Sequence, residues 1–334
     1  MKNTNMSRKI LALCCALCLL LVASSAAMAE AEIPYVGIIQ YATHPSLDNC
    51  YTGFVAALAD AGYVDGETVN IELQNSMADM SNSDLQAKTM AAKDADMLVG
   101  IATPSAMSAY AVTKEAGTPV IFIAVSDAVA AGIVQSNEAT GTNCTGVSDV
   151  LNIPAQLAMI RAFLPEATKI GVVYTTSEPN SVVQLEVLTA AAPEYGFEIV
   201  PMGITNGAEI AAATTSLIAK GVDCFNNFTD NLVVENISLL LHVTDEAGIP
   251  VFGSEETQVA SGCLATEGLD YLALGYRAGE MAVSILKGEA TPETIPVATD
   301  SDTTPVYNSE VAARLGLALP AGYEGAMDMA AVAE

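Results

Sequence analysis

Apolar residues follow two distinct patterns along the first half of the chain. Short apolar or alternating runs predict strands over 33–39, 69–73, 97–102, 119–125 and 144–147. Between the strands, apolar residues at helical spacing predict helices over 47–58 and 85–95, and Pro104 opens a third helix. Ser83 and Gln86 predict a capping box near the start of the second helix. Continuous apolar strands joined by helices are typical of a parallel sheet covered on both faces.

The same alternation restarts after Pro154. Strands are predicted over 169–174, 197–202, 222–225, 250–252 and 263–265. Helices are predicted over 155–163, 180–191, 209–219 and 232–247. The offset of about 130 residues is too long for a solenoid repeat and indicates two similar α/β lobes.

A further apolar helix is predicted over 270–288. Because the remaining chain is too short for a third domain, we expect this helix to pack on the first lobe, so that the chain crosses between lobes more than once. The expected first lobe is 33–150 with about 270–295, and the expected second lobe is 151–269 with about 296–320. The predicted fold class is therefore α/β, with two doubly wound parallel-sheet lobes joined by a multi-strand hinge.

The N-terminus has the layout of a secretory signal peptide. Three basic residues and no acid come before an apolar run over 10–22, and small residues then lead to a cleavage site after Ala29. An apolar run of about 13 residues is shorter than the roughly 20 that span a membrane. Cys14, Cys15 and Cys18 lack the small-residue motif of a lipoprotein. We therefore expect 1–29 to be removed and the protein to act on the periplasmic or extracellular side of the cytoplasmic membrane.

Composition narrows the classes of function. The chain has 12 Lys and Arg against 39 Asp and Glu, a formal net charge of −27, so nucleic acids and anionic membrane surfaces are excluded as partners. Cys50, Cys144, Cys224 and Cys263 are far apart in sequence and are expected to be unpaired. With only His44 and His242 in the chain, no metal site is expected, and His242 is interpreted as a structural residue.

Candidate binding residues follow the predicted strands. In an open parallel sheet with strand order 2-1-3-4-5, ligands bind beyond the carboxyl ends of strands one, three and four. The loops at those positions in both lobes carry hydroxyl, amide or acidic side chains, at Thr103, Ser105, Ser126, Asp127, Asn180, Ser181, Thr229, Asp230, Asn231 and Glu255. Each of these residue types also serves as an ordinary helix N-cap, but matching chemistry in both lobes favours a ligand site.

No catalytic motif accompanies these loops. The sequence has no nucleophile elbow, and no glycine-rich phosphate loop follows a strand. His44 is a possible general base, but no Ser or Cys lies in a recognisable nucleophile context. We therefore expect a protein that is not an enzyme and that needs no cofactor.

Several of the same loops resemble one bacterial family. The segments are Gln40-Tyr41, His44-Pro45-Ser46-Leu47-Asp48, Ala102-Thr103-Pro104-Ser105, Val125-Ser126-Asp127, Asn143 to Asp149, Glu178-Pro179-Asn180-Ser181 and Thr229-Asp230-Asn231. They resemble the substrate-binding components of ABC importers, in the branch that includes tryptophan- and tyrosine-binding proteins. The resemblance covers nearly all of 33–320, with departures at Ser126, where Thr is usual, and at Cys144, where an aliphatic residue is usual.

The resemblance implies a type I periplasmic-binding-protein fold that traps a small ligand between two closing lobes. It also implies a membrane permease and a cytoplasmic ATPase as partners of a monomeric receptor. The implied ligand is an amino acid, with tryptophan, tyrosine or phenylalanine as the first choices.

For such a ligand, each polar group has an expected partner. The carboxylate is expected at Thr103, Ser105 and the N–H groups of the following helix, with Ser126, Asn180 and Ser181 completing the shell. For the ammonium group, Asp230 is preferred over Asp127 and Glu255. Tyr41 and Tyr174, at the ends of the first strands, are expected to stack on the aromatic ring.

Two alternatives to a transport receptor remain at this stage. One is an exported enzyme that uses cleft carboxylates such as Asp127 and Glu255 on a small substrate. The other is a ligand-sensing subunit of a signalling receptor.

Overall fold

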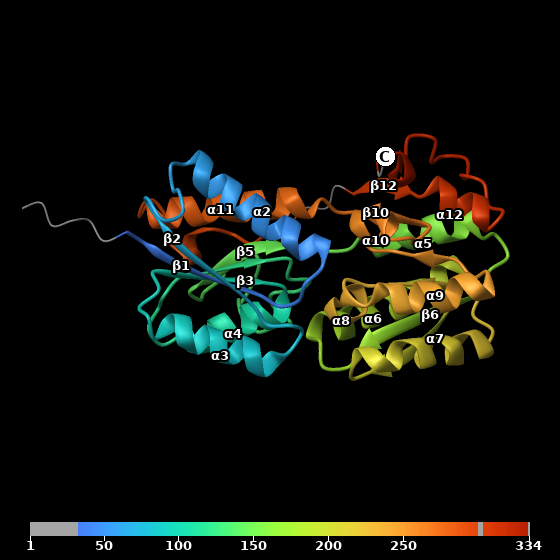
Figure 1. Ribbon diagram of the computed structural model, residues 1–334, viewed down its shortest axis with the longest axis horizontal. Helices are drawn as coiled ribbons and strands as arrows, with labels where there is room; N and C mark the ends of the chain where they lie inside the picture. Colours follow the sequence, from blue (N-terminus) through green and yellow to red (C-terminus); the bar gives the residue numbers. More distant parts are fainter. Residues whose placement is uncertain (1–32, 300–302, 333–334) are drawn as a thin grey trace, which may run out of the picture. The chain divides into compact units, whose positions relative to one another are not determined.

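A six-stranded parallel sheet forms the centre of the first lobe in the computed structural model, which describes residues 33–299 and 303–332 (Figure 1). Its strands are β1 (Tyr35–Gln40), β2 (Asn70–Asn75), β3 (Met97–Ile101), β4 (Val120–Ile123), β5 (Cys144–Ser148) and β11 (Ala298–Thr299). They lie in the order β11-β5-β4-β3-β1-β2, which contains the expected order 2-1-3-4-5. Every residue of β3 and β4 is buried, which explains their continuous apolar sequence. The predicted signal peptide, 1–29, lies outside the described residues.

Helices cover both faces of this sheet. One hydrophobic core contains residues of α2 (Pro45–Asp60) and α11 (Tyr271–Leu286), and the other contains residues of α3 (Met80–Ala91) and α4 (Thr103–Thr113). The two pairs lie on opposite sides of the strands in Figure 1. A Cβ on Gly53 of α2 would overlap the Leu272 carbonyl, and one on Gly275 of α11 would overlap the Cys50 carbonyl. Helices α2 and α11 therefore pack closely against each other on one face of the first sheet.

The second lobe repeats this plan around a four-stranded parallel sheet. Its strands are β6 (Lys169–Thr175), β7 (Glu198–Ile204), β8 (Cys224–Asn226) and β9 (Val251–Phe252), in the order β7-β6-β8-β9. Residues of α5 (Ile153–Phe163) and α6 (Pro179–Ala191) contribute to one core. Residues of α7 (Ile210–Ala219), α8 (Asn231–Glu235) and α9 (Ile237–Ala247) contribute to the other. Short 3₁₀ turns lie at η1 (Ala192–Tyr195) and η2 (Gly207–Glu209).

A small three-stranded sheet completes the second lobe. Strand β12 (Thr304–Tyr307) pairs antiparallel with β10 (Ala265–Gly268) and parallel with β13 (Met327–Asp328). The backbone N–H of Leu264 donates to the Val251 carbonyl at 2.6 Å, so the chain entering β10 continues the four-stranded sheet. The sequence patterns did not predict the short elements here, which are α10 (Glu256–Ala260), β12, α12 (Ser309–Arg314), β13 and α13 (Met329–Val332). They also did not predict η3 (Pro292–Thr294), which lies beside β5 of the first lobe.

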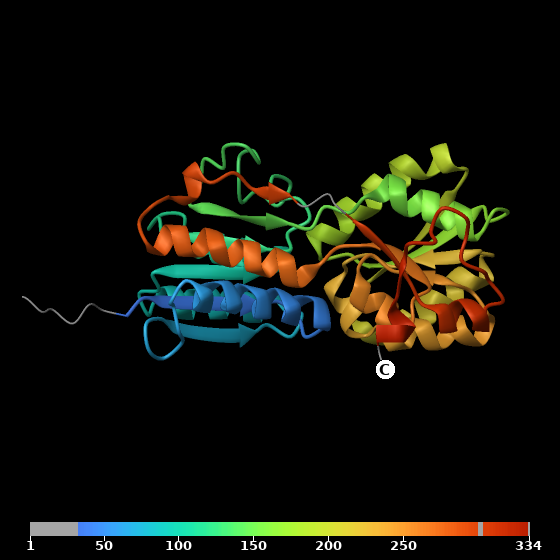
Figure 2. The same ribbon diagram turned by 90° about the horizontal axis from the view of Figure 1, so that it is seen from above.

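The chain passes between the lobes after β5, after β10 and after β11, and Figure 2 shows these segments from above. Because β11 pairs with β5, residues 298–299 belong to the first sheet, and the last crossing falls later than the expected position of about 296. Each lobe is therefore discontinuous in sequence, because α11 and β11 return to the first lobe after the chain has entered the second.

Several local predictions are corrected by the structure. Helix α3 begins at Met80, where the Asp79 carboxylate accepts from the Asn82 N–H at 3.0 Å, so Ser83 is not its cap. The helix predicted over 232–247 is divided at Asn236 into α8 and α9. The side chain of His242 is 74% exposed and lies 3.7 Å from Glu246, so it has no role in the core.

The four cysteines expected to be unpaired, Cys50, Cys144, Cys224 and Cys263, are free and buried. Within 33–299 and 303–332, no helix has both the length and the apolar character needed to cross a membrane. The same residues contain no group of three or more His, Cys, Asp or Glu arranged to hold a metal ion.

Candidate ligand-binding site

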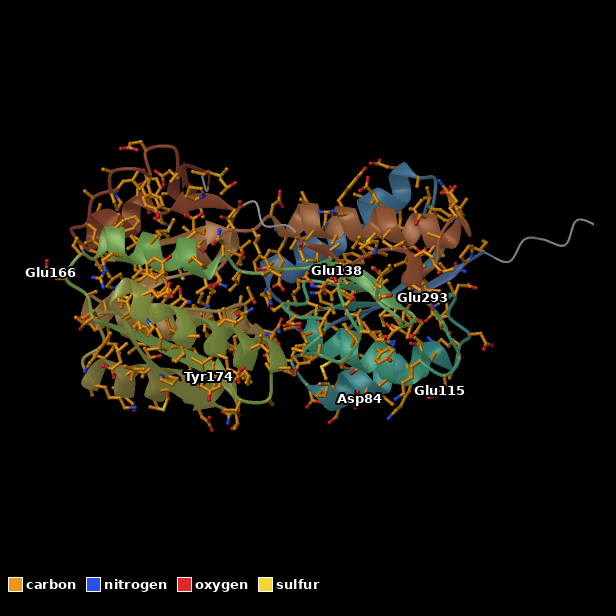
Figure 3. The ribbon with its side chains drawn as sticks, turned by 180° about the vertical axis from the view of Figure 1, so that it is seen from behind. Asp84, Glu115, Glu138, Glu166, Tyr174 and Glu293 are labelled. Atoms are coloured by element: carbon orange, nitrogen blue, oxygen red, sulfur yellow. The ribbon has the colours of Figure 1, made fainter. Side chains whose placement is uncertain are left out.

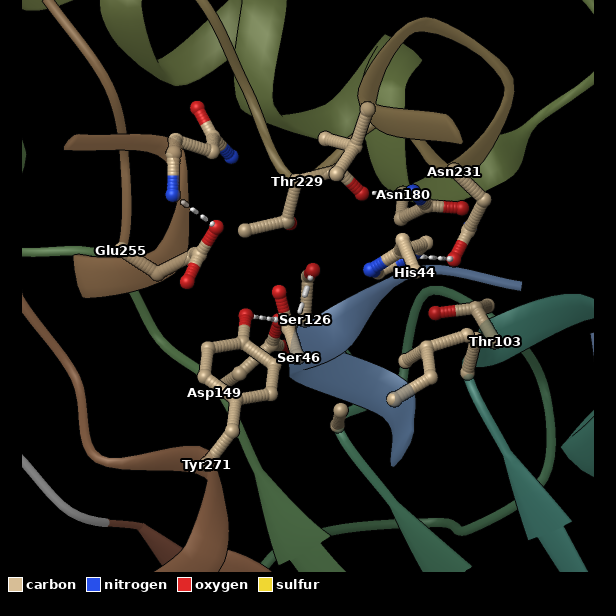
Figure 4. A pocket seen from close by; sticks show the side chains of 15 residues that line it. His44, Ser46, Thr103, Ser126, Asp149, Asn180, Thr229, Asn231, Glu255 and Tyr271 are labelled. Carbon is tan, nitrogen blue, oxygen red and sulfur yellow. Dashed lines mark hydrogen bonds between the residues drawn. The ribbon is translucent and has the colours of Figure 1, made fainter. Parts of the chain in front are cut away.

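A small cavity lies where the carboxyl ends of the strands of both lobes meet (Figure 4). Its volume is about 10 Å³, which is about the space that one water molecule occupies. Polar lining residues of the first lobe and its hinge are His44, Ser46, Thr103, Ser126, Asp149 and Tyr271. Those of the second lobe are Asn180, Thr229, Asn231, Glu255 and Gln258.

Half of the predicted site residues line this cavity. They are Thr103, Ser126, Asn180, Thr229, Asn231 and Glu255. Asp127 instead lines an adjoining cavity of about 190 Å³, and its carboxylate accepts from the N–H groups of Val129 and Ala130. Ser105 and Ser181 are fully buried behind the cavity, where their hydroxyls bond to Ser83 and Asp230.

The two tyrosines expected to stack on the ligand do not line the cavity. The Tyr41 hydroxyl donates to the Ala78 carbonyl at 3.1 Å, and its ring belongs to the core of the first lobe. Tyr174, labelled in Figure 3, is half-buried and packs against the core of the second lobe.

The first turn of α4 presents an unpartnered hydroxyl to the cavity. Thr103 is 2% exposed, yet its Oγ1 has no hydrogen-bond partner among the described residues. The preceding residue, Ala102, adopts a φ of 77°, a conformation that costs free energy for a residue with a side chain. This strained turn begins an 11-residue helix at the cavity wall, where free backbone N–H groups favour an anion.

Asp230, which the sequence predicted to bind the ammonium group, lies in a buried network of hydrogen bonds within the protein. Its carboxylate accepts from the Thr175 hydroxyl at 2.7 Å, the Ser181 hydroxyl at 2.7 Å and the Val233 N–H at 3.0 Å. The Thr175 N–H also donates to it, and the side chain is fully buried. Asp230 is therefore the N-cap of α8 and does not reach the cavity.

Glu178 is a buried acid that the sequence patterns did not single out. Its Oε2 accepts from the side-chain amide of Asn231 at 2.6 Å, from the Asn231 backbone N–H at 3.0 Å and from the side-chain amide of Asn180 at 3.2 Å. Its Oε1 accepts from the Leu232 N–H at 3.0 Å. Burial and the charge of Asp230 raise the pKa of Glu178, while these N–H donors favour the ionised form.

His44 lies between the cavity and Asn231 (Figure 4). Its Nε2 is 3.4 Å from Asn231 Oδ1, and its Nδ1 has no partner among the described residues. Burial lowers the pKa of His44 to about 4, so the ring is neutral at pH 7. Because Asn231 uses its amide nitrogen on Glu178, its oxygen faces the ring, and Nε2 carries the proton.

The opposite part of the cavity is acidic. Asp149 accepts from the Tyr271 hydroxyl at 2.7 Å and the Ser126 hydroxyl at 3.1 Å, and burial raises its pKa to about 6. Glu255 accepts from the Thr257 N–H at 2.7 Å, and burial also raises its pKa. No Lys or Arg is among the described residues that line the cavity. A ligand that brings a positive group would therefore meet an uncompensated negative surface.

Hydrogen bonds join the two lobes around the cavity. The Gln184 amide of the second lobe donates to the Ser126 hydroxyl at 2.7 Å and also to Thr229 Oγ1 at 2.6 Å. The hydroxyls of Ser46 and Thr257 lie 3.1 Å apart. The cavity in this arrangement has room for about one water molecule, so a larger ligand requires these contacts between the lobes to separate.

The sequence pattern of the family described as "ABC transporter substrate binding protein" matches residues 35–322. The chain belongs to this family. It is 41% identical over 275 residues to the tyrosine-binding protein of Clostridioides difficile strain R20291. These aligned residues cover 82% of this chain and 79% of the relative. The resemblance inferred from the loop motifs is thereby confirmed, and the protein is a substrate-binding component of an ABC transporter.

Solved structures of this family have the same fold. The ABC domain from Streptococcus pneumonia in complex with L-Trp is 33% identical, with a TM-score of 0.83 over 86% of this chain and 96% of that chain. The ligand-free, open structure of CD0873 from Clostridium difficile is 39% identical, with a TM-score of 0.67 over 89% of this chain and 99% of that chain. The lower TM-score against the open structure, despite its higher identity, agrees with the contacts between the lobes of this protein.

Proposed function

We propose that this protein delivers an amino acid, with an aromatic side chain, to an ABC importer. The observation that carries the proposal is the polarity of the cavity. Two buried carboxylates, Asp149 and Glu255, face a space that also receives the start of a helix and the unpartnered hydroxyl of Thr103. A zwitterion fits both features, because the buried carboxylates favour a ligand that carries a positive charge and the helix start offers hydrogen-bond donors to a carboxylate.

The carboxylate of the ligand is assigned to the N-terminus of α4. Thr103 Oγ1 can donate one hydrogen bond there, and backbone N–H groups of the first helical turn supply others. Ser126 and Asn180 line the same cavity, but their donor groups are already used, the Ser126 hydroxyl on Asp149 and the Asn180 amide on Glu178 and Thr229. The hydroxyls of Ser105 and Ser181 are likewise used within the protein.

An aromatic side chain is proposed from the relatives. One relative is named as a tyrosine-binding protein, and one solved structure of the family is a complex with L-Trp. The cavity of about 10 Å³ holds about one water molecule, so an amino acid requires the lobes to separate and then to close on it. Closure on a ligand should lower the radius of gyration measured by small-angle scattering.

The cellular setting follows from the family and the N-terminus. Proteins that bind substrates for ABC importers work outside the cytoplasm, and 1–29 carry the layout of a signal peptide. A permease in the membrane and an ATPase in the cytoplasm are the proposed partners of a monomeric receptor. The role needs no catalysis, so the bound amino acid should be released chemically unchanged.

Calorimetric titration with the twenty amino acids tests the proposal directly. Tryptophan, tyrosine or phenylalanine should bind and raise the melting temperature, by an amount equivalent to about 2.7 kcal/mol at 100 times the dissociation constant. Because the chain has no Trp, bound tryptophan would also give an indole emission against a tyrosine background. Binding of a sugar or nucleoside with no binding of any amino acid would contradict the ligand assignment, and chemical conversion of the ligand would contradict the receptor role.

A further inference from the structure

Three polar atoms of the cavity lining are buried and have no hydrogen-bond partner among the described residues. They are Thr103 Oγ1, Asn180 Oδ1 and His44 Nδ1. Buried polar atoms are nearly always paired, so unpaired atoms around one cavity indicate groups that a ligand satisfies. The chemical type of each atom therefore reveals which end of the ligand it meets.

Glu178 determines whether the unpaired Asn180 atom is a donor or an acceptor. The amide nitrogen of Asn180 donates to Glu178 Oε2 at 3.2 Å and to the Thr229 carbonyl at 3.1 Å. Both partners are acceptors, so the nitrogen must face them and the oxygen must remain on the other side. Asn180 Oδ1 is thus left as an unpaired acceptor.

Whether His44 Nδ1 is a donor or an acceptor also depends on Glu178, which acts through Asn231. Glu178 accepts the side-chain N–H of Asn231 at 2.6 Å, which leaves Asn231 Oδ1 to face His44 Nε2 at 3.4 Å. An oxygen in that position requires the proton on Nε2, so Nδ1 of the neutral ring carries a lone pair. Glu178 therefore makes both Asn180 and His44 acceptors.

We propose that Glu178 is a positioning residue that makes the Asn180 and His44 side of the cavity a binding site for the ammonium group of the ligand. Glu178 does not line the cavity, and its carboxylate acts only through the two amides that it orients. The inference rests on the proposed function, because it assigns one end of an amino-acid ligand. It replaces Asp230 as the acid on which recognition of the ammonium group depends.

The test compares L-tyrosine with 3-(4-hydroxyphenyl)propionate, which has the same ring and carboxylate but no ammonium group. Glu178→Met removes both acceptor oxygens at similar side-chain volume, so Asn180 and Asn231 can turn their N–H₂ groups toward the cavity. Tyrosine affinity should fall about tenfold or more, while affinity for the propionate should change less than about threefold. Glu178→Gln keeps one acceptor oxygen and should fall between the wild type and Glu178→Met.

Matched controls separate positioning from loss of structure. Glu209→Gln changes a carboxylate that also accepts backbone and side-chain N–H bonds near a helix start, but an exposed one, and both affinities should stay within twofold of the wild type. If Glu178→Met does not fold, Asn180→Ser removes the amide oxygen itself and should reproduce the selective loss of tyrosine binding.

The outcomes distinguish this inference from the proposed function. Equal loss of both ligands in the Glu178 variants, or an unchanged ratio of the two affinities, would overturn the positioning role while leaving the receptor role intact. A wild-type protein that binds the propionate as tightly as tyrosine would overturn the ammonium assignment alone. A wild-type protein that binds no amino acid would overturn the proposed function.

Discussion

The two lobes build their sides of the cavity in different ways. In the second lobe, Glu178 and Asp230 hold the polar residues in a network in which the carboxylates receive hydrogen bonds from several N–H and O–H groups. Of the polar atoms of the described cavity lining, Thr103 Oγ1 and His44 Nδ1 in the first lobe have no partner, and in the second lobe Asn180 Oδ1 has none. The carboxylates of the second lobe are thus satisfied before a ligand arrives, while Thr103 and His44 in the first lobe depend on the ligand for their last hydrogen bonds.

This difference predicts that substitutions in the second-lobe network reduce stability, whereas substitutions of the unpaired first-lobe atoms reduce ligand affinity. Asp230→Ala is the strongest test of the first half. It leaves the Thr175, Ser181 and Val233 donors without an acceptor, so unfolding by urea should show a loss of about 3 kcal/mol or more. Asp127→Ala removes a cap with two backbone donors and should cost about 1 kcal/mol. Equal free energies of unfolding for the two variants would contradict the prediction that the Asp230 network stabilises the second lobe.

The hinge residue Asp149 allows a test by the pH dependence of the free energy of unfolding. Burial raises its pKa in the folded protein from 3.8 to about 6, so the stability that it contributes is fully present below pH 3.8 and is lost as pH rises through about 6. The two values correspond to about 3 kcal/mol. Asp149→Asn keeps an acceptor for the Tyr271 hydroxyl and removes the titration. The difference in unfolding free energy between wild type and variant should therefore change between pH 4 and 6, and a constant difference would contradict the assignment.

Thr103→Val is the matching test of the first lobe and has the smallest expected effect. The variant has nearly the same shape and removes a hydroxyl that has no partner among the described residues. The ligand-free protein should therefore keep its stability or gain up to about 1 kcal/mol, while affinity for the amino acid should fall about tenfold. Ser181→Ala, which removes a bonded hydroxyl of the second lobe, should do the reverse. Reduced stability of Thr103→Val without any change in affinity would place the hydroxyl outside the ligand site.

The fold was largely predictable because buried parallel strands have a distinctive sequence. All of Met97–Ile101 is buried, and its unbroken apolar run can be recognised without knowledge of its neighbours. The break at Asn236 was not predictable in this way, since apolar spacing continues from α8 into α9. There the Asn236 side chain donates to the Leu232 carbonyl at 2.9 Å, a local interaction that periodicity does not record.

The candidate site was predictable only in part, because the sequence does not show in which direction a polar side chain points. Polar residues at strand ends and helix starts can face the ligand or face one another, and the sequence is the same in both cases. Thr103 faces the cavity, whereas Ser181 and Asp230 bond to each other. Asp149 and Tyr271 were missed because they lie on the hinge and at the start of α11, and only the folded chain brings them together.

The glycine contact between α2 and α11 has a consequence for how this protein folds. Phe54 and Leu58 of α2 belong to a core that includes Leu274 and Ala278 of α11, more than two hundred residues later. A chain emerging N-terminus first cannot bury that core until both sheets of parallel strands, up to β9, and α11 itself have been made. The first lobe is therefore an unfinished structure for most of synthesis, and a truncation before residue 286 should yield an aggregating fragment with no independently folded first lobe.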